Sequence, residues 1–238
     1  MLNKQNHNLT MSNILKDIYS DTSIAPLLGF KGGTCAYFFY DLPRFSVDLD
    51  FDLFNSDENT QKLILEKIVN ILSVYGKIKD SYIKRYTIFA MLSYSYTDHN
   101  IKVEINTRDF TGHARKYYEI KEHLGTSMLV AKKEYLFSTK LIALTERKEL
   151  ASRDVYDILY FARNNWDIDS EVIKSRTGRS IKEQLANCIK SVETLNENKV
   201  LHGLGELVDE KQKTWIKENL KADTIFMLKN YIDSLERK

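Results

Sequence analysis

The feature of this chain that most directly suggests chemistry is a run of three aspartates, two residues apart: Asp48, Asp50 and Asp52. Apolar residues alternate with them over positions 47–53, and successive side chains of a strand point to opposite faces. The pattern therefore predicts a strand with one apolar face and one acidic face. Like charges this close repel unless a cation lies among them, and Mg²⁺ prefers such oxygen ligands. The alternative is the solvated outer face of an edge strand.

Glu104 offers a third carboxylate for such a metal site. Residues 87–96 and 101–107 are rich in β-branched and aromatic residues, with the polar Asp98-His99-Asn100 between them, so they predict a β-hairpin. Glu104 lies on the polar side of the second strand. If that strand neighbours the acidic strand, Glu104 joins the same face. Otherwise it is an exposed glutamate paired with Lys102 or another neighbour.

A phosphate-binding turn is predicted shortly before the acidic strand. Gly32 and Gly33 precede Thr34, which is a suitable N-cap for a short apolar helix ending near Tyr40. Exposed N–H groups and the dipole at a helix N-terminus favour phosphate. A plain tight turn would use the same residues.

The loop between this helix and the acidic strand carries Arg44 and Ser46. Arg44 could hold a triphosphate oxygen, because guanidinium groups bind phosphate strongly, and the Ser46 hydroxyl could assist it. Alternatively, Arg44 pairs with one of the nearby aspartates.

Lys140 and Arg147 are seven residues apart in a predicted helix over 132–147, so they point to the same side. Lys140 lies among apolar residues and needs an anionic partner, for which a nucleotide phosphate would serve. The alternative is a lysine whose stem is buried and whose ammonium group reaches solvent.

Asp154 and Asp157 share one face of the next predicted helix, over 153–162. Asp154 in the first turn also complements the helix dipole, which is a purely structural explanation. Apolar residues follow Asp157, so we expect it to point at least partly inward. Farther along, four basic residues predict either a contact to an RNA backbone or a solvated turn: Lys174, Arg176, Arg179 and Lys182.

The composition is that of a soluble globular protein, with 238 residues, 43% hydrophobic and 29% charged. A net charge of +2 is too small to indicate a partner. Cys35 and Cys188 are isolated and suggest neither a disulfide framework nor a zinc site. Neither a signal-peptide pattern nor an apolar run of about 20 residues is present, so we expect a cytoplasmic protein without a membrane partner.

The order of predicted elements indicates an α+β part followed by an all-helical part. The helical pattern begins after about Leu124, with helices expected over 132–147, 153–162, 180–195 and 211–235. The polar residues 1–10 are expected to be frayed.

Several of these stretches resemble the AbiEii/AbiGii nucleotidyltransferase toxins, a family to which the MenT toxins also belong. The first motif of the family is similar to Phe30-Lys31-Gly32-Gly33-Thr34 followed by Leu42-Pro43-Arg44-Phe45-Ser46-x-Asp48-Leu49-Asp50-Phe51. Its downstream motifs are similar to Lys140-Leu-Ile-Ala143-Leu-Thr-Glu-Arg147 and Arg153-Asp154-Val-Tyr-Asp157. The resemblance covers about residues 30–161. One departure is that Ala151 and Ser152 precede Arg153, where the family often has further basic residues.

The resemblance implies an α+β, DNA polymerase β-like nucleotidyltransferase fold with a helical C-terminal region. Residues 1–125 would form the nucleotidyltransferase core, and residues 126–238 a helical domain that completes the active site. The implied reaction moves a nucleoside monophosphate from an NTP to an acceptor, with Mg²⁺. By motif position the catalytic residues would be Asp48, Asp50, Lys140 and Asp157, and the metal ligands Asp48, Asp50 and Glu104. The implied nucleotide-binding residues are Gly32, Gly33, Thr34, Arg44, Ser46 and Arg147.

Some relatives modify tRNA 3′ ends as toxins of toxin–antitoxin pairs. The resemblance therefore also implies a tRNA acceptor, a cognate antitoxin and a role in phage defence. Two alternatives stay open: nucleotidylation of a protein target, and a non-enzymatic RNA-binding module on the same fold. The clustered carboxylates argue against such a module, because it would gain nothing from them.

Overall fold

The structure is a computed structural model that describes residues 3–95, 100–108 and 114–237. The chain divides into two compact units. The first comprises Met1–Asp41 and Phe45–Lys132, and the second comprises Leu42–Arg44 and Lys133–Lys238. The three-residue segment Leu42–Arg44 thus belongs to the second unit, although the sequence on both sides of it belongs to the first.

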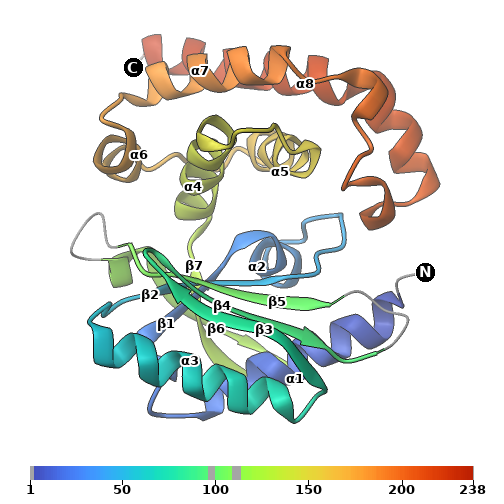
Figure 1. Cartoon of the computed structure of the whole chain (residues 1–238). Coiled ribbons are helices and arrows are strands. Elements are labelled where there is room, and N and C mark those ends of the chain that lie inside the picture. The colour runs from blue at the N-terminus through green and yellow to red at the C-terminus, as the bar shows by residue number, and fades with distance from the viewer. Residues whose placement is uncertain (1–2, 96–99, 109–113, 238) are drawn as a thin grey trace. The chain divides into compact units, whose positions relative to one another are not determined.

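A seven-stranded mixed sheet forms the centre of the first unit, in the order β3-β4-β5-β2-β1-β7-β6 (Figure 1). The β2–β5 and β1–β7 pairs are parallel, and the other neighbouring pairs are antiparallel. The strands are β1 (Leu28–Lys31), β2 (Leu49–Leu53), β3 (Lys77–Lys84), β4 (Thr87–Ser93), β5 (Ile101–Asn106), β6 (Tyr118–His123) and β7 (Thr126–Ala131).

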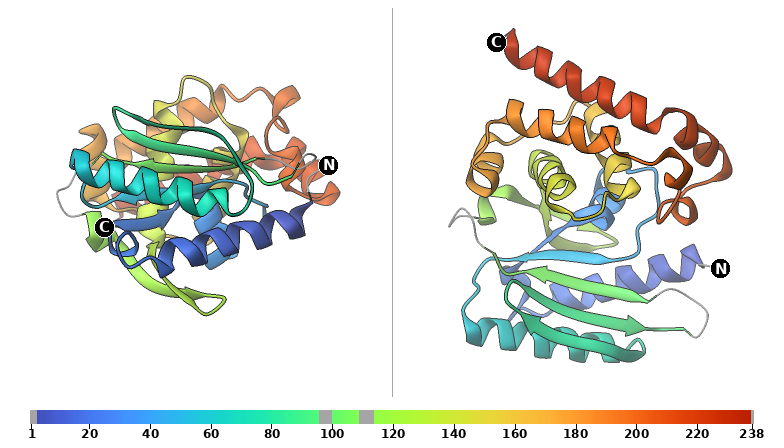
Figure 2. Two further views of the ribbon diagram at one scale, coloured as in Figure 1. Left: turned by 60° about the horizontal axis from the view of Figure 1, so that its bottom comes forward. Right: turned by 45° about the horizontal axis from the view of Figure 1, so that its top comes forward.

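Helices cover both faces of this sheet. α1 (Lys4–Ser20) and α3 (Glu58–Ser73) lie on one face, and α2 (Gly32–Phe39) lies on the other (Figures 1 and 2). The buried stripe of α3 recurs every fourth residue, as expected for an amphipathic helix, and consists of Ile64, Ile68 and Leu72. The apolar face of β2 is buried as well, which confirms that this strand packs on a core: Leu49, Phe51 and Leu53.

The prediction that residues 1–10 are frayed is wrong for the described part of that segment. α1 begins at Lys4, and the Asn3 side chain caps it by accepting a hydrogen bond from the Asn6 N–H. His7 is fully buried, with one ring nitrogen 2.7 Å from the Tyr94 hydroxyl and the other 3.0 Å from the Val47 carbonyl. The polar composition concealed a helix that anchors its N-terminal turns by hydrogen bonds.

The predicted hairpin of β4 and β5 is confirmed by antiparallel pairing, with Phe89 opposite Glu104. Its predicted turn includes Asp98 and His99, which lie outside the described residues. The sequence did not predict β3 or the β6–β7 hairpin. β6 is an edge strand whose Ile120 is 74% exposed, so the chain there lacks the alternation of a half-buried strand.

Because β6 and β7 are strands, the helical pattern begins at Lys133 and not near Leu124. The two units divide between Lys132 and Lys133. The sequence-based division at 125/126 falls instead at the tip of the β6–β7 hairpin, where Gly125 adopts a φ of 77°.

The second unit is all-helical (Figure 1). Its aromatic core includes Phe161, whose ring stacks on Trp166 with centroids 4.1 Å apart. α8 packs along α5 and α7, and α4 contacts α5, α6 and α7. The helices are α4 (Lys133–Glu146), α5 (Ser152–Arg163), α6 (Ser170–Thr177), α7 (Ile181–Glu193) and α8 (Glu210–Glu236). Across the described residues, no helix has the length and apolarity needed to span a membrane.

Candidate active site

The acidic strand is β2, and the structure brings Glu104 beside it as the sequence suggested. β2 pairs with β5 in parallel, and Asp50 is the register partner of Glu104. On the other side, Asp50 is opposite Lys31 of β1. Asp48 and Asp50 are half-buried, whereas Glu104 is exposed. The sheet order therefore places two partly shielded carboxylates and one solvated carboxylate on neighbouring strands.

The backbone turn at Gly32 is shaped around the Asp50 carboxylate. Gly32 has a φ of 80°, a conformation that residues with a side chain rarely adopt, and a Cβ there would lie 2.2 Å from Asp50 Oδ2. Gly32 is also the first residue of α2. The Asp50 carboxylate consequently lies at the positive end of a helix dipole, which favours a concentration of negative charge.

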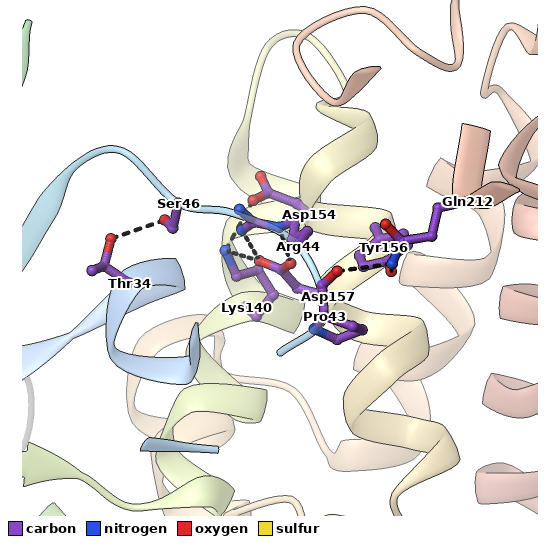
Figure 3. Close-up of polar contacts among 9 residues, drawn as sticks. All are labelled: Thr34, Pro43, Arg44, Ser46, Lys140, Asp154, Tyr156, Asp157 and Gln212. Carbon is purple, nitrogen blue, oxygen red and sulfur yellow. Dashed lines mark hydrogen bonds and ion pairs between the residues drawn. The ribbon is translucent and has the colours of Figure 1, made fainter. Parts of the chain in front are cut away.

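Thr34 does not act as the predicted N-cap. α2 begins at Gly32, and Lys31 is the N-cap without a side-chain hydrogen bond. Thr34 is fully buried, and its hydroxyl lies 2.9 Å from the Ser46 hydroxyl and within hydrogen-bonding reach of the Asp48 carbonyl (Figure 3). Since a hydroxyl donates only one hydrogen, donation to the Asp48 carbonyl leaves Thr34 to accept from Ser46. These two hydroxyls therefore hold the backbone at Asp48, and their roles as phosphate ligands stay predictions.

Asp52 has a structural role that the sequence did not reveal. It is 2% exposed, and its Oδ1 accepts hydrogen bonds from the Lys31 ammonium and, at 2.7 Å, from Asn106 Nδ2. Its Oδ2 accepts from the Tyr118 hydroxyl at 2.7 Å. Asp52 thus joins β1, β5 and β6, and its charge is already balanced by Lys31. The signal in the sequence was a lysine beside the glycine turn, but pairing the two residues requires the strand order.

The pair of carboxylates at Asp48 and Asp50 suits a divalent cation better than a cluster of three carboxylates that includes Glu104. Among residues 3–95, 100–108 and 114–237, no group of three or more His, Cys, Asp or Glu side chains is placed to hold a metal ion. Mg²⁺, however, is usually held by only one or two carboxylates together with substrate phosphates and water. Two half-buried carboxylates beside a helix N-terminus fit that donor set. Glu104 as a further ligand stays a prediction.

In the second unit, Arg44 pairs with Asp157 and not with an aspartate of β2. Arg44 Nε lies 2.6 Å from Asp157 Oδ1, and Arg44 Nη2 lies 2.7 Å from Asp157 Oδ2 (Figure 3). Both side chains are buried, at 3% and 0% exposure. The Arg44 guanidinium therefore forms a two-point ion pair that holds Asp157 in place. A direct contact between Arg44 and a nucleotide stays a prediction.

This pair extends into a cluster of five charged residues, which we call the cationic cluster: Arg44, Lys140, Arg147, Asp154 and Asp157. Lys140 Nζ lies 3.0 Å from an oxygen of each aspartate. Arg147 Nε lies 2.9 Å from Asp154 Oδ2, and its side chain is 42% exposed. The structure confirms that Lys140 and Arg147 point to the same side and that Asp157 points inward.

The cationic cluster carries more positive than negative charge. Three cationic side chains face two carboxylates, which leaves a formal charge of +1. Lys140 is only 16% exposed, so its ammonium is poorly compensated by water. A phosphate group reaching this cluster would balance the excess charge.

The pKa values in the cluster follow from this pairing. Burial works against the charged form of Asp154, but Lys140 and Arg147 outweigh it and hold its pKa below the ordinary value. Burial would likewise lower the pKa of Lys140, but Asp154 and Asp157 outweigh it and raise that pKa. At neutral pH both groups are therefore charged.

These shifts predict how stability depends on pH. The folded-state pKa of Asp154 is depressed from 3.8, so its stabilising contribution is present above about pH 4 and is lost as the pH falls further. Lys140 has a raised pKa, so its contribution is present below about pH 10 and is lost as the pH rises past its folded-state value. We expect the thermal unfolding midpoint to be steady between these limits and to fall below pH 4.

The Asp154→Asn variant should have a lower thermal unfolding midpoint than the wild type at pH 7. Below pH 4 its midpoint should fall less steeply than that of the wild type. Asp233→Asn, which removes an exposed aspartate of the same unit, is the matched control. If both variants keep the wild-type acid profile, then Asp154 does not stabilise the unit through its charge.

The other basic group singled out in the sequence is largely occupied by contacts within the protein. Arg176 Nη2 donates to the Tyr135 hydroxyl at 2.8 Å, and Arg179 Nη1 donates to Gln184 Oε1 at 3.1 Å. Lys182 pairs with Glu236. The segment forms the end of α6 and the start of α7, so the solvated-turn alternative describes it better than an RNA contact.

Solved structures and a protein-family model allow a comparison with known proteins. No curated protein sequence matches the chain significantly. A solved structure of a candidate nucleotidyltransferase from Helicobacter pylori has a TM-score of 0.63 and 22% identity, covering 98% of this chain and 96% of that one. A second H. pylori structure, JHP933, has a TM-score of 0.62 and 19% identity, covering 100% of this chain and 96% of that one.

A third similar structure is MenT4, a nucleotidyltransferase toxin from Mycobacterium tuberculosis. Its TM-score is 0.58 and its identity 14%, covering 98% of this chain and 86% of that one. These likenesses confirm the predicted nucleotidyltransferase fold. The family model described as nucleotidyl transferase AbiEii toxin, type IV toxin–antitoxin system, matches residues 13–222. The chain therefore belongs to the AbiEii family of nucleotidyltransferase toxins.

Proposed function

We propose that this nucleotidyltransferase moves a nucleoside monophosphate from an NTP to the 3′ end of tRNA, with Mg²⁺, in the cytoplasm. We further propose that a cognate antitoxin counteracts it, as its family implies. The observation that carries the proposal is the Asp48–Asp50 pair beside the Gly32 turn. This arrangement gathers negative charge at a helix N-terminus, where a divalent cation would neutralise it and also attract the phosphates of a nucleotide.

In this proposal Asp48 and Asp50 hold the cation, which when bound neutralises phosphate charge and orients the triphosphate. Thr34 and Ser46 keep the backbone at Asp48 in place. The acceptor hydroxyl attacks the α-phosphorus, a new phosphorus–oxygen bond forms, and pyrophosphate leaves. The groups of this chain contribute chiefly by positioning and by balancing charge, as in other phosphoryl-transfer sites.

We also propose that the helical unit completes the active site and that Lys140 and Arg147 bind phosphates of the nucleotide. The support is the formal +1 charge of the cationic cluster and the low exposure of Lys140. Arg44 and Asp157 then act as positioning residues, because each is buried and paired with the other.

The acceptor can be identified by incubating the protein with each α-labelled NTP in turn, Mg²⁺ and total tRNA. We expect one NTP to label a band of tRNA size that ribonuclease removes and proteinase leaves. Label that resists ribonuclease but is removed by proteinase would show that the acceptor is a protein and not tRNA.

A further inference from the structure

A cavity of about 810 Å³ lies in the helical unit, at the start of α5. Four of its lining residues are basic or able to become cationic: Arg147, Arg153, Lys199 and His202. The only acidic residue in the lining is Glu149, which is exposed. The cavity is therefore suited to an anion. Only Arg147 is shared with the cationic cluster.

The N-terminus of α5 also lines this cavity. Ser152 is the first residue of α5 and is 5% exposed. The N-cap residue Ala151 provides no side-chain hydrogen bond to this helix. The positive end of this helix dipole favours an anion in the cavity, in the same sense as the basic side chains do.

A second, smaller cavity of about 270 Å³ adjoins the first, because both are lined by Arg147, Leu150 and Thr194. It adds Lys148 and Lys190 and no acidic residue. Together the two cavities form a continuous basic track, defined by Arg147, Lys148, Arg153, Lys190, Lys199 and His202. Several basic side chains spread over two adjoining cavities suit the successive phosphates of a nucleic acid strand.

The lining favours the backbone of such a strand over its bases. None of the residues lining either cavity is Phe, Tyr or Trp, the side chains on which bases commonly stack. An apolar protein partner is disfavoured as well, because most of the lining residues are charged or polar. A phosphodiester backbone matches the charge and leaves the bases outside.

We propose that the basic track binds the sugar–phosphate backbone of the RNA acceptor. This inference rests on the proposed function, since it assumes an RNA acceptor, and it assigns that acceptor a site that adjoins the proposed NTP site and shares Arg147 with it. Lys190 and Lys199 lie in different cavities and outside the cationic cluster, so they report on the track alone.

The test measures equilibrium binding of fluorescently labelled total tRNA at several KCl concentrations, without catalysis. Lys190→Glu and Lys199→Glu should each weaken binding about tenfold at low salt and reduce the slope of log K against log salt by about 1. Lys229→Glu, an equal charge change at an exposed site of α8, should leave both quantities unchanged. Binding of the NTPs, measured by calorimetry, should be unaffected in all three variants.

Two results would overturn the proposal. If Lys190→Glu and Lys199→Glu bind tRNA as Lys229→Glu does, the track does not hold RNA. If they weaken NTP binding as much as tRNA binding, the track is a triphosphate site. Asp50→Asn should still bind tRNA normally, so a failed catalytic assignment is distinguishable from a failed track.

Discussion

Asp50→Asn and Asp48→Asn each lower the rate of nucleotidyl transfer at least about a thousandfold, while the protein stays folded. This is the largest effect that we expect from a single substitution. Asparagine keeps the size of the side chain but removes the charge that a divalent cation requires, and loss of metal-assisted charge stabilisation costs several kcal/mol. The measurement is the initial rate of label transfer from the α-labelled NTP at saturating Mg²⁺.

Asp80→Asn is the matched control, since Asp80 is an exposed strand aspartate of the same sheet. It should transfer label at the wild-type rate. Thermal unfolding of all three variants shows whether the fold is intact. Wild-type rates in both Asp48→Asn and Asp50→Asn would mean that β2 does not carry the metal site.

Asp157→Asn destabilises the protein by about 3–5 kcal/mol, because it leaves the buried Arg44 guanidinium without its counter-charge. The measurement is the free energy of unfolding from denaturant titration, followed by a helix signal. Arg44→Met should cost less, because Lys140 Nζ still lies 3.0 Å from Asp157 Oδ2. The double variant should cost clearly less than the sum of the two, because neither charge is then left alone.

Asp223→Asn provides the control for this prediction. Asp223 also pairs with an arginine, Arg163, but the two side chains are 35% and 46% exposed. Exposed pairs contribute about 1 kcal/mol or less. If Asp157→Asn and Asp223→Asn lower the free energy of unfolding equally, the buried pair contributes no more to stability than the exposed pair.

The sequence predicted the parts of the fold that are encoded locally. The alternation over 47–53 identified β2, and the two β-rich runs identified the β4–β5 hairpin, because each pattern lies within a short stretch. β6 was missed because an exposed edge strand has no buried face to produce alternation. The start of α1 was missed and residues 1–10 were expected to be frayed, because its first turns are held by polar contacts such as those of His7.

Only part of the candidate site could be predicted, again because local sequence does not encode contacts between distant segments. The residue types at Asp48, Asp50 and Lys140 could be identified from motif and spacing. Their pairing could not, because it depends on distant parts of the chain: Arg44 and Asp157 are 113 residues apart, and Asp52 and Tyr118 are 66 apart. Local sequence offers no signal that chooses Asp157 over a nearer aspartate as the partner of Arg44. The basic track was missed because its residues come from three separate segments.

We expect the chain to transfer a nucleotide and not a phosphate. The most direct measurement compares two preparations of the same NTP, one labelled at the α-phosphate and one at the γ-phosphate, with Mg²⁺ and total tRNA. We predict that the acceptor carries the α label, that the γ label is released as pyrophosphate, and that Asp50→Asn prevents both. An acceptor that carries the γ label would contradict this account, because it would show phosphoryl transfer in place of nucleotidyl transfer.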